Sequence, residues 1–89
     1  MPKIVLITGA TSGFGKACAE KFASEGYDLI LNGRREHRLV EIKSTLEKKF
    51  NIAVCLLPFD VRNRESTFKH IQAIPESWQG IDVLVNNAG

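Results

Sequence analysis

Apolar positions along the chain follow two patterns, short unbroken runs and longer stretches in which they recur every three or four residues. Unbroken runs are typical of strands covered on both faces, and the longer recurrence is typical of amphipathic helices. The runs predict strands at residues 3–8, 27–31, 53–58 and 81–85, and the recurrence predicts helices at 12–24, 35–50 and 64–74. Strict alternation of strand and helix indicates a parallel α/β sheet.

Each helical segment carries a stripe of side chains that we expect to face the sheet. The stripes are Phe14, Cys18 and Phe22 with Ala19 and Ala23, then Leu39, Ile42, Leu46 and Phe50, and finally Phe68, Ile71 and Ile74. Gly26 stands where a glycine that ends the first helix is expected. Pro75 stops the third helix, because proline cannot continue the hydrogen-bond pattern.

Handedness predicts which face of the sheet each helix covers, for a given order of the strands. If the order is 3-2-1-4, right-handed crossovers place the first two helices on one face and the third on the other. Residues 81–85 then form an unpaired edge, although Val83, Leu84 and Val85 are as apolar as a central strand. Because a parallel sheet is normally covered on both faces, we expect a Rossmann-like, doubly wound α/β fold of which only the first half is present. Residues 1–89 would then belong to a single domain that continues beyond Gly89.

Composition and charge narrow the classes of partner. Hydrophobic residues make up 44% and charged residues 25% of the 89 residues, as in an ordinary globular domain, and the net charge is +2. That excess is too small for the concentrated basic face of a nucleic-acid-binding protein, and the apolar runs are too short to cross a membrane. The first strand begins almost at Met1, so we expect no signal peptide and a cytoplasmic protein. Cys18 and Cys55 lie far apart among apolar residues, which predicts two buried, reduced thiols and no metal site.

A glycine-rich segment, TGATSGFG at residues 8–15, follows the first predicted strand directly. Glycines cost conformational entropy on folding, so their positions need a reason. Gly9 would allow the sharp exit from the strand, Gly13 would let a pyrophosphate approach the backbone, and Gly15 would let the helix pack closely on the sheet. The free N–H groups and the positive end of the helix dipole would then face the phosphates. Ser12 is either the cap of this helix or a hydroxyl donor to a phosphate oxygen, and a plain tight turn is the alternative to a ligand site.

A second segment of small residues, NNAG at residues 86–89, follows the last predicted strand. In the order 3-2-1-4 the first and last strands are neighbours, and their carboxyl ends flank the point where the winding reverses. Ligands of open α/β sheets bind in the crevice at this point. The coincidence of both segments there predicts a phosphate-bearing ligand, against the alternative that Asn86 and Asn87 form a plain turn.

Together, TGATSGFG and the later NNAG resemble the short-chain dehydrogenases/reductases, a family of nicotinamide-dependent oxidoreductases, over essentially the whole chain. Their spacing, Gly-x-x-x-Gly-x-Gly, differs from the Gly-x-Gly-x-x-Gly of the more familiar dinucleotide fingerprint. The segments NGRREHRL, FDVRNRE and IDVLVNNAG are similar to the branch that oxidises serine and related 3-hydroxy acids with NADP. The cofactor-binding residues that we predict are Gly9, Ala10, Thr11, Ser12, Gly13, Phe14, Gly15, Arg34, Arg35, Asp60, Val61, Asn86, Asn87, Ala88 and Gly89.

Two arginines stand where NAD-binding proteins usually carry an acid. The second predicted strand is followed by Arg34 and Arg35, with no carboxylate at its tip. A 2′-phosphate is nearly dianionic and matches planar guanidinium groups, so this tip favours NADP, with Arg34 as the main contact and Arg35 as a second contact or a stack on the adenine. The alternative, a solvated start of a helix, is less favourable because cations there oppose the helix dipole. We expect Arg38 and Lys16 to be solvated surface charges.

The remaining roles follow from the resemblance alone. It implies that Asp60 accepts a hydrogen bond from the adenine amino group, with the Val61 backbone nearby. It also implies that Asn86 lies along the nicotinamide ribose, and that Ala88 and Gly89 are small so that the cofactor can pass close to the backbone. For residues 60–61 the alternative is an ordinary turn at the end of a strand.

The family's catalytic motif is not found in the 89 residues. The resemblance implies reversible hydride transfer with a small-molecule carbonyl or alcohol, a Tyr as acid/base with a Lys four residues on, and a Ser on the substrate oxygen. Tyr27 is the one tyrosine and Leu31 follows four residues later, so we predict no catalytic residue here. We expect the N-terminal, dinucleotide-binding part of an NADP-dependent oxidoreductase that is a homo-oligomer, a tetramer or a dimer, at full length. The alternative is a non-catalytic nucleotide-binding module or an isolated fragment without turnover.

Overall fold

A computed structural model gives the fold of the chain and describes residues 3–59 and 64–87. Its elements are β1 (Ile4–Ile7), α1 (Gly13–Ser24), β2 (Asp28–Gly33), α2 (Glu36–Phe50), β3 (Val54–Pro58), α3 (Arg64–Gln72), the 3-10 helix η1 (Glu76–Trp78) and β4 (Ile81–Val85). Every predicted strand and helix is present, within a residue or two at either end. The short helix η1 follows Pro75 and was not expected from the sequence.

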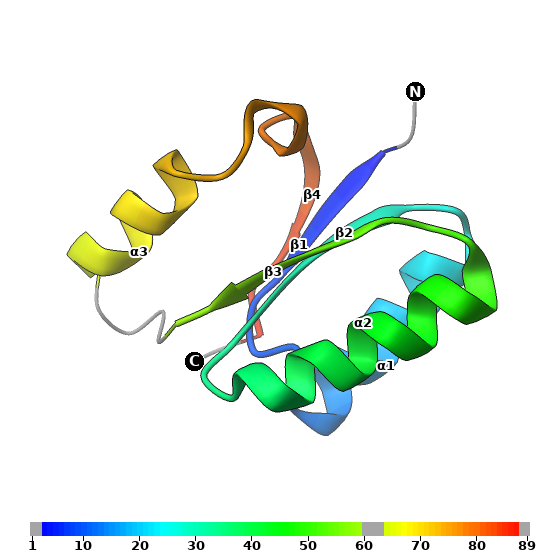
Figure 1. The fold of residues 1–89 in the computed structure, drawn as a ribbon. Coiled ribbons are helices and arrows are strands. Elements are labelled where there is room, and N and C mark those ends of the chain that lie inside the picture. Colours follow the sequence, from blue (N-terminus) through cyan, green and yellow to red (C-terminus); the bar gives the residue numbers. More distant parts are fainter. Residues whose placement is uncertain (1–2, 60–63, 88–89) are drawn as a thin grey trace.

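The four strands form one parallel sheet in the order β3-β2-β1-β4, as predicted. β1 aligns Val5 with Leu29 of β2 and with Val83 of β4. The pairing with β4 is irregular between Ile4 and Val5, and there the carboxylate of Asp82 accepts a 2.9 Å hydrogen bond from the Ile4 main chain. The helices α1 and α2 lie on one side of the sheet and α3 with η1 on the other, as right-handed crossovers require (Figure 1).

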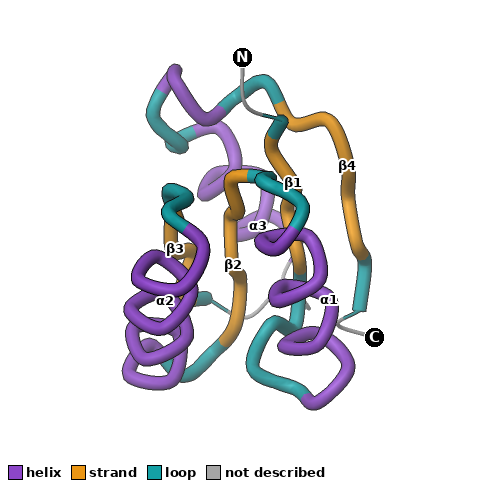
Figure 2. The backbone as a smooth tube through the Cα atoms, turned by 90° about the vertical axis from the view of Figure 1, so that its right-hand side faces the viewer, coloured by secondary structure: helices purple, strands orange, loops and turns teal. Residues whose placement is uncertain are grey.

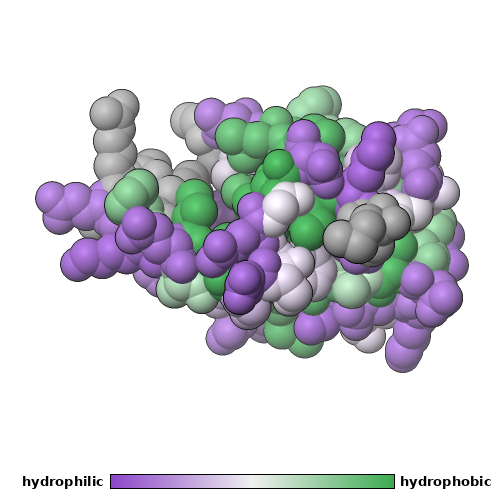
Figure 3. Space-filling model, turned by 90° about the horizontal axis from the view of Figure 1, so that it is seen from above, coloured by the Kyte–Doolittle hydropathy of each residue, from purple (hydrophilic) through white to green (hydrophobic). Residues whose placement is uncertain are grey.

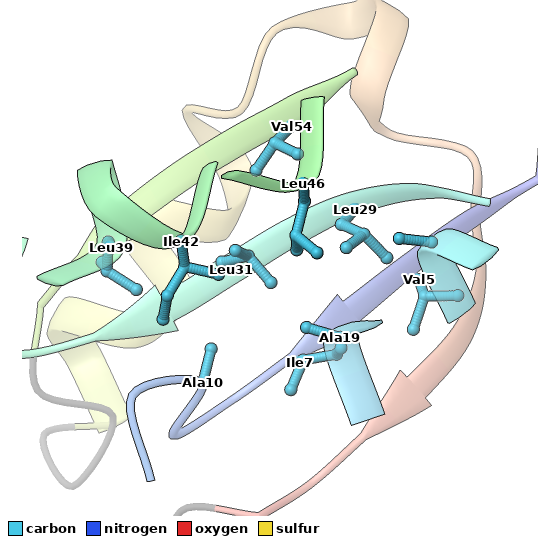
Figure 4. Close-up of a cluster of buried hydrophobic side chains, with 11 residues drawn as sticks. Val5, Ile7, Ala10, Ala19, Leu29, Leu31, Leu39, Ile42, Leu46 and Val54 are labelled. Atoms are coloured by element: carbon cyan, nitrogen blue, oxygen red, sulfur yellow. The ribbon is translucent and has the colours of Figure 1, made fainter. Parts of the chain in front are cut away.

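The main core lies between the sheet and the helices α1 and α2. Figure 4 shows its side chains gathered between the strands and these two helices. The buried members are Val5, Ile7, Ala10, Ala19, Ala23, Leu29, Leu31, Leu39, Ile42, Leu46 and Val54. The stripe predicted on α2 is therefore confirmed for Leu39, Ile42 and Leu46, and Phe50 packs at its margin. Burial of this apolar surface is the main favourable term in the folding of the chain.

The helix α1 faces the sheet with Ala19 and Ala23 of the predicted stripe, while Cys18 and Phe22 pack at the margin of the core. The buried residues of α1 are Gly15, Ala19 and Ala23. Their small side chains let the helix approach the sheet closely, which moves the larger residues to its flanks. Phe14 is 66% exposed, so the prediction that it faces the core is wrong. Cys18 and Cys55 are half-buried free thiols, which corrects the expectation of full burial.

The opposite face of the sheet carries a smaller core, covered by the segment that follows α3. Its buried members are Ile4, Leu6, Ile30, Leu57 and Ile74. Ile74 lies just after α3 and reaches the sheet as predicted. Phe68 and Ile71, however, are 63% and 37% exposed, so the prediction that these two face the sheet is wrong. The reason is visible in Figure 1, where the axis of α3 stands off from the strands.

β4 forms one edge of the sheet, since among the described strands it pairs with β1 alone. Its side chains alternate between half-buried and exposed positions, and Leu84 is 60% exposed. The expected combination of an edge position with an apolar composition is thus present. Figure 3, which looks down on the molecule from above the view of Figure 1, shows apolar and polar residues intermixed on that face. Within residues 3–59 and 64–87, no helix has the length and apolar character needed to cross a membrane.

The ends of α1 and α2 are set by residues in the left-handed region. Gly26 follows α1 with a φ of 88°, and its N–H donates to the Ala23 carbonyl at 3.0 Å. This confirms the predicted helix-ending glycine. Asn51 ends α2 with a φ of 54°, a conformation that asparagine tolerates better than most residues.

Candidate functional site

The carboxyl ends of β1 and β4 lie side by side, because the two strands are parallel neighbours with Ile7 opposite Val85. Figure 2 shows the chain leaving both strands at the same end of the sheet. The main-chain N–H of Thr8 donates to the carbonyl of Val85 at 3.0 Å, which extends the pairing beyond β1. The glycine-rich loop and residues 86–87 therefore meet where the crevice was predicted.

The glycine-rich loop leaves β1 through a sharp turn at Gly9, whose φ of 62° lies in the left-handed region. The next residue, Ala10, donates its main-chain N–H to the carbonyl of Asn32 at 2.8 Å, so the loop is tied to β2. The methyl group of Ala10 is buried in the main core. The predicted reason for a glycine at position 9 is confirmed, whereas Ala10 is buried and its N–H is already donated to Asn32.

Ser12 caps the start of α1. Its Oγ accepts a 3.1 Å hydrogen bond from the N–H of Gly15 and donates at 2.9 Å to the carbonyl of Gly9. The same oxygen accepts a 2.6 Å hydrogen bond from Nδ2 of Asn87. A hydroxyl has one proton and two lone pairs, and all three are engaged. The structure therefore favours the capping role over donation to a phosphate oxygen.

Gly15 is the point at which α1 approaches the loop most closely. A Cβ at this position would collide with the main-chain oxygen of Gly9 and would lie 3.0 Å from both the Ala10 Cα and the amide nitrogen of Asn87. Backbone atoms cannot move aside as a flexible side chain can, so a methyl group would force the helix away from the sheet. The predicted packing role of Gly15 is confirmed.

The first turn of α1 presents main-chain donors to the crevice. A helix leaves its first N–H groups without acceptors inside the helix, and the Ser12 cap uses only that of Gly15. The N–H groups of Gly13 and Phe14 lie at the positive end of the same helix dipole. A Cβ on Gly13 would have no heavy atom within 4 Å, so there is space for another molecule beside this turn.

Asn87 closes the loop from the side of β4. Its main-chain N–H donates to Oγ1 of Thr8 at 2.9 Å, and its Nδ2 donates to the carbonyl of Gly9 at 3.1 Å and to Oγ of Ser12 at 2.6 Å. Both protons of the side-chain amide are therefore donated to the glycine-rich loop. Sequence reasoning placed Asn87 in the site but missed this role, because nothing in the local pattern marks a partner 75 residues away.

Asn32, which sequence reasoning did not single out, ties together the ends of neighbouring strands. Its side chain is 2% exposed, and its Nδ2 donates to the carbonyls of Leu57 and Phe59 at 2.9 and 3.0 Å. Buried polar groups are normally paired, so a polar residue at the end of an apolar strand was the available signal. Phe59 directly precedes the two residues predicted to contact adenine, and its ring stacks on His70 with centroids 4.2 Å apart.

The arginine pair follows β2 at the same end of the sheet. Arg34 and Arg35 are both exposed. Gly33 keeps this tip close to the loop, since a Cβ there would lie 3.2 Å from Cγ2 of Thr11 and 3.3 Å from Cδ2 of Leu39. Arg35 directly precedes α2 and makes no side-chain capping bond. The predicted pair thus lies beside the glycine-rich loop with both side chains open to solvent.

The thiol of Cys55 is the titratable group whose environment changes its pKa most clearly among the described residues. Burial raises the pKa, and the ammonium group of Lys43 lowers it by less. Cys55 packs against the smaller core, on β3, away from the loop. A protonated thiol at that place is not a candidate nucleophile.

The structure brings together loop residues 9–15, the arginine pair and residues 86–87. Asn86 is exposed, with its Oδ1 3.3 Å from the hydroxyl of Thr8. The predicted contacts Asp60, Val61, Ala88 and Gly89 lie outside the described residues. Over the part of the chain that the structure describes, no group of three or more His, Cys, Asp and Glu side chains is placed to hold a metal ion.

A parallel sheet in the order 3-2-1-4, with a glycine-rich helix start where the winding reverses, defines the first half of a Rossmann-like fold. The chain belongs to the short chain dehydrogenase family, whose sequence profile matches residues 3–89. The resemblance carried by TGATSGFG and NNAG is thereby confirmed.

Similar proteins include members of the branch that the sequence suggested. The chain is 47% identical over its whole length to sulfoacetaldehyde reductase 2 of Chromohalobacter salexigens. It is 44% identical over 97% of its length to the NADP-dependent 3-hydroxy acid dehydrogenase YdfG of Escherichia coli K12, and 43% identical over its whole length to serine 3-dehydrogenase of Agrobacterium fabrum. The chain spans about a third of the length of these relatives, 34%, 33% and 34% respectively.

Solved structures agree with the fold. The L-sorbose reductase of Gluconobacter frateurii, crystallised with NADPH and L-sorbose, superposes with a TM-score of 0.90 and is 40% identical. The match covers 99% of this chain and 34% of that one. The Rossmann-like α/β fold predicted from the sequence is confirmed.

Proposed function

We propose that the protein is an NADP-dependent oxidoreductase that transfers a hydride between nicotinamide and a carbonyl or alcohol carbon of a small molecule. Residues 1–89 supply its cofactor site. The observation that carries the proposal is the first turn of α1, where the N–H groups of Gly13 and Phe14 lie beside open space at the point where the winding reverses. Family membership supports it, as do relatives whose names specify NADP and a similar structure that holds NADPH.

The loop fits a pyrophosphate in both shape and charge. The open space beside Gly13 admits the diphosphate to the main chain, and the positive end of the helix dipole attracts its negative charge. Ser12 and Asn87 hold the loop in place through hydrogen bonds of their own, so it needs little rearrangement on binding. When bound, the cofactor supplies or accepts the hydride; the residues of this chain bind and orient it.

The arginine pair selects NADP over NAD. The tip of β2 carries the guanidinium groups of Arg34 and Arg35 and no carboxylate that would repel a 2′-phosphate. A hydrogen bond to a charged group contributes roughly 1.5–3 kcal/mol, and solvent screening at this exposed position places the value near the lower end. The preference for NADP would then be at least about tenfold.

In this proposal, the catalytic groups of the enzyme lie in the part of the full-length protein that follows Gly89. Tyr27 directly precedes β2, at the end of the sheet opposite the crevice, and Leu31 takes the place that a catalytic lysine would need. The matched relatives are about three times as long as this chain, which leaves room for a catalytic half. By analogy with the 3-hydroxy acid and serine dehydrogenases among these relatives, the substrate is serine or another small 3-hydroxy acid. We also propose, from the sequence alone, that the full-length enzyme is a cytoplasmic homo-oligomer.

The test is a titration of the full-length protein with NADPH and NADH, followed by a screen of serine and short 3-hydroxy acids as substrates. We expect saturable binding of NADPH, at least about tenfold weaker binding of NADH, and turnover of one or more of the acids. Equal binding of both cofactors, or binding of neither, would contradict the proposal. NADPH binding without turnover of any carbonyl or alcohol would instead favour a non-catalytic nucleotide-binding module.

A further inference from the structure

A cavity of about 230 Å³ opens between the first turns of α1 and α2, next to the proposed cofactor site. Its lining comes from three elements and comprises Thr11, Lys16, His37, Arg38, Glu41 and Ile42. Thr11 belongs to the glycine-rich loop, so one wall of the cavity is the back of the proposed pyrophosphate site. From sequence alone, Lys16 and Arg38 were expected to be unrelated surface charges.

The cations of this cavity come from different helices and converge on one space. Lys16 lies in the first turn of α1, and Arg38 lies in the first turn of α2. Glu41 contributes one carboxylate to the same lining, and the imidazole of His37 adds a hydrogen-bonding ring. Two fixed positive charges against one negative charge leave the cavity net positive.

The start of α2 also places main-chain N–H groups beside this cavity. The first N–H groups of α2 receive no side-chain cap, because Arg35 at the capping position has no acceptor. Arg35 therefore does not cap the N–H groups at the positive end of the α2 dipole. The carboxylate of Glu36, in the same turn, offsets part of that positive charge.

The cavity lies within reach of the tip of β2. The N–H of Arg38 donates to the carbonyl of Arg35 at 3.1 Å, so the two residues share one helical turn. A Cβ on Gly33 would lie 3.2 Å from Cγ2 of Thr11. The glycine therefore lets the Thr11 wall of the cavity lie against the tip of β2. A phosphate held by the arginine pair would thus border the cavity.

We propose that Lys16 and Arg38 are specificity-determining residues for the 2′-phosphate of the cofactor. The inference rests on the proposed function, since it assumes that the dinucleotide lies across this loop. The guanidinium of Arg38 and the ammonium of Lys16 line the cavity beside the tip of β2, where they attract the phosphomonoester anion of the cofactor. Preference for NADP is then shared between the arginine pair and this cavity.

Two probes that differ only in the 2′-phosphate test the proposal: 2′,5′-ADP and 5′-AMP, titrated calorimetrically into the full-length protein at low and high salt. The test variants are Lys16→Gln, Arg38→Gln and the double variant. Matched controls are Lys21→Gln on α1 and Lys48→Gln on α2, which remove the same charge at the far ends of the two helices. All of these positions are exposed, so the variants should fold, and thermal unfolding checks this.

We expect each test variant to reduce the preference for 2′,5′-ADP over 5′-AMP by about two- to fivefold, because partly solvated charges are screened. The double variant should lose more, the loss should shrink at high salt, and the controls should match the parent. An unchanged preference in the double variant, together with a loss in Arg34→Ala, would overturn this inference and leave the proposed function intact. Equal weakening of both probes would also overturn it. A parent that prefers neither probe would overturn the proposed NADP site itself.

Discussion

The side-chain amide of Asn87 donates a 2.6 Å hydrogen bond to Oγ of Ser12, a residue 75 positions earlier in the chain. The same nitrogen reaches the carbonyl of Gly9, so one side chain after β4 holds the turn that follows β1. The glycine-rich loop is therefore completed by a segment from the other end of the chain. Its geometry depends on this contact as much as on its own glycines.

Replacing Asn87 by alanine should loosen the loop. We expect Asn87→Ala in the full-length protein to lower the free energy of unfolding by about 1–2 kcal/mol, since two hydrogen bonds in a partly buried place are lost. NADPH affinity should fall with it. Urea unfolding and a fluorescence titration measure the two effects. Asn86→Ala is the control for stability, because Asn86 is exposed, and equal stability of the two variants would show that the contact does not hold the loop.

Two glycines of the loop should respond in opposite ways to alanine. Gly15→Ala places a methyl group against the main-chain oxygen of Gly9, so we expect the melting temperature to drop by several degrees. Gly13→Ala meets no atom within 4 Å and should fold as well as the parent or slightly better. Its methyl group would occupy the space proposed for pyrophosphate, so NADPH affinity should fall by about tenfold. Unaltered NADPH binding by a folded Gly13→Ala protein would argue against the proposed phosphate position.

Removing Arg34 should affect one cofactor and spare the other. We expect Arg34→Ala to weaken NADPH binding by about 10- to 100-fold, while NADH binding stays within about twofold of the parent. The difference arises because the 2′-phosphate is the group that the guanidinium contacts in the proposal. Parallel titrations of both cofactors measure it, with Lys48→Ala as a control for loss of charge on the exposed surface of α2. Parent-like binding of both cofactors would refute the assignment.

The raised pKa of Cys55 gives a prediction about pH. Because burial favours the neutral thiol, Cys55 should be alkylated by iodoacetamide more slowly at pH 8 than a peptide of residues 53–57. The unfolded chain ionises this thiol at a lower pH than the folded chain does. Its contribution to stability is therefore present below the ordinary thiol pKa and is lost as pH rises through the higher folded value. Mass spectrometry of the Cys55 peptide gives the rate, and alkylation as fast as in the free peptide would contradict the prediction.

The sequence predicted those features that local physics decides. Unbroken apolar runs located β1 to β4, and the helix-ending glycine at position 26 was correct. For the strand order 3-2-1-4, handedness correctly placed α1 and α2 on one face of the sheet and α3 on the other. Glycine spacing also gave Gly9 and Gly15 their backbone and packing roles. Each of these depends on a few neighbouring residues or on a rule that holds for any parallel sheet.

Features that depend on distant partners could not be predicted in the same way. Phe14 has the right spacing for the core, but the small stripe beside it allows closer packing and takes its place. Phe68 has the right spacing too, but α3 stands off from the sheet and leaves it exposed. The partners of Asn32 and Asn87 come from other strands, and the shared cavity of Lys16 and Arg38 exists only once two helices lie side by side.

The bond between Ser12 and Asn87 also orders events during synthesis. A ribosome adds roughly 5–20 residues per second, so about 4–15 seconds separate the emergence of the two partners. Until β4 has docked on β1, the turn after β1 lacks its hydrogen bonds to Asn87, and the nascent chain has no complete cofactor site. The cofactor would then stabilise the nascent chain only after β4 has docked, because a ligand stabilises those states that already contain its binding site.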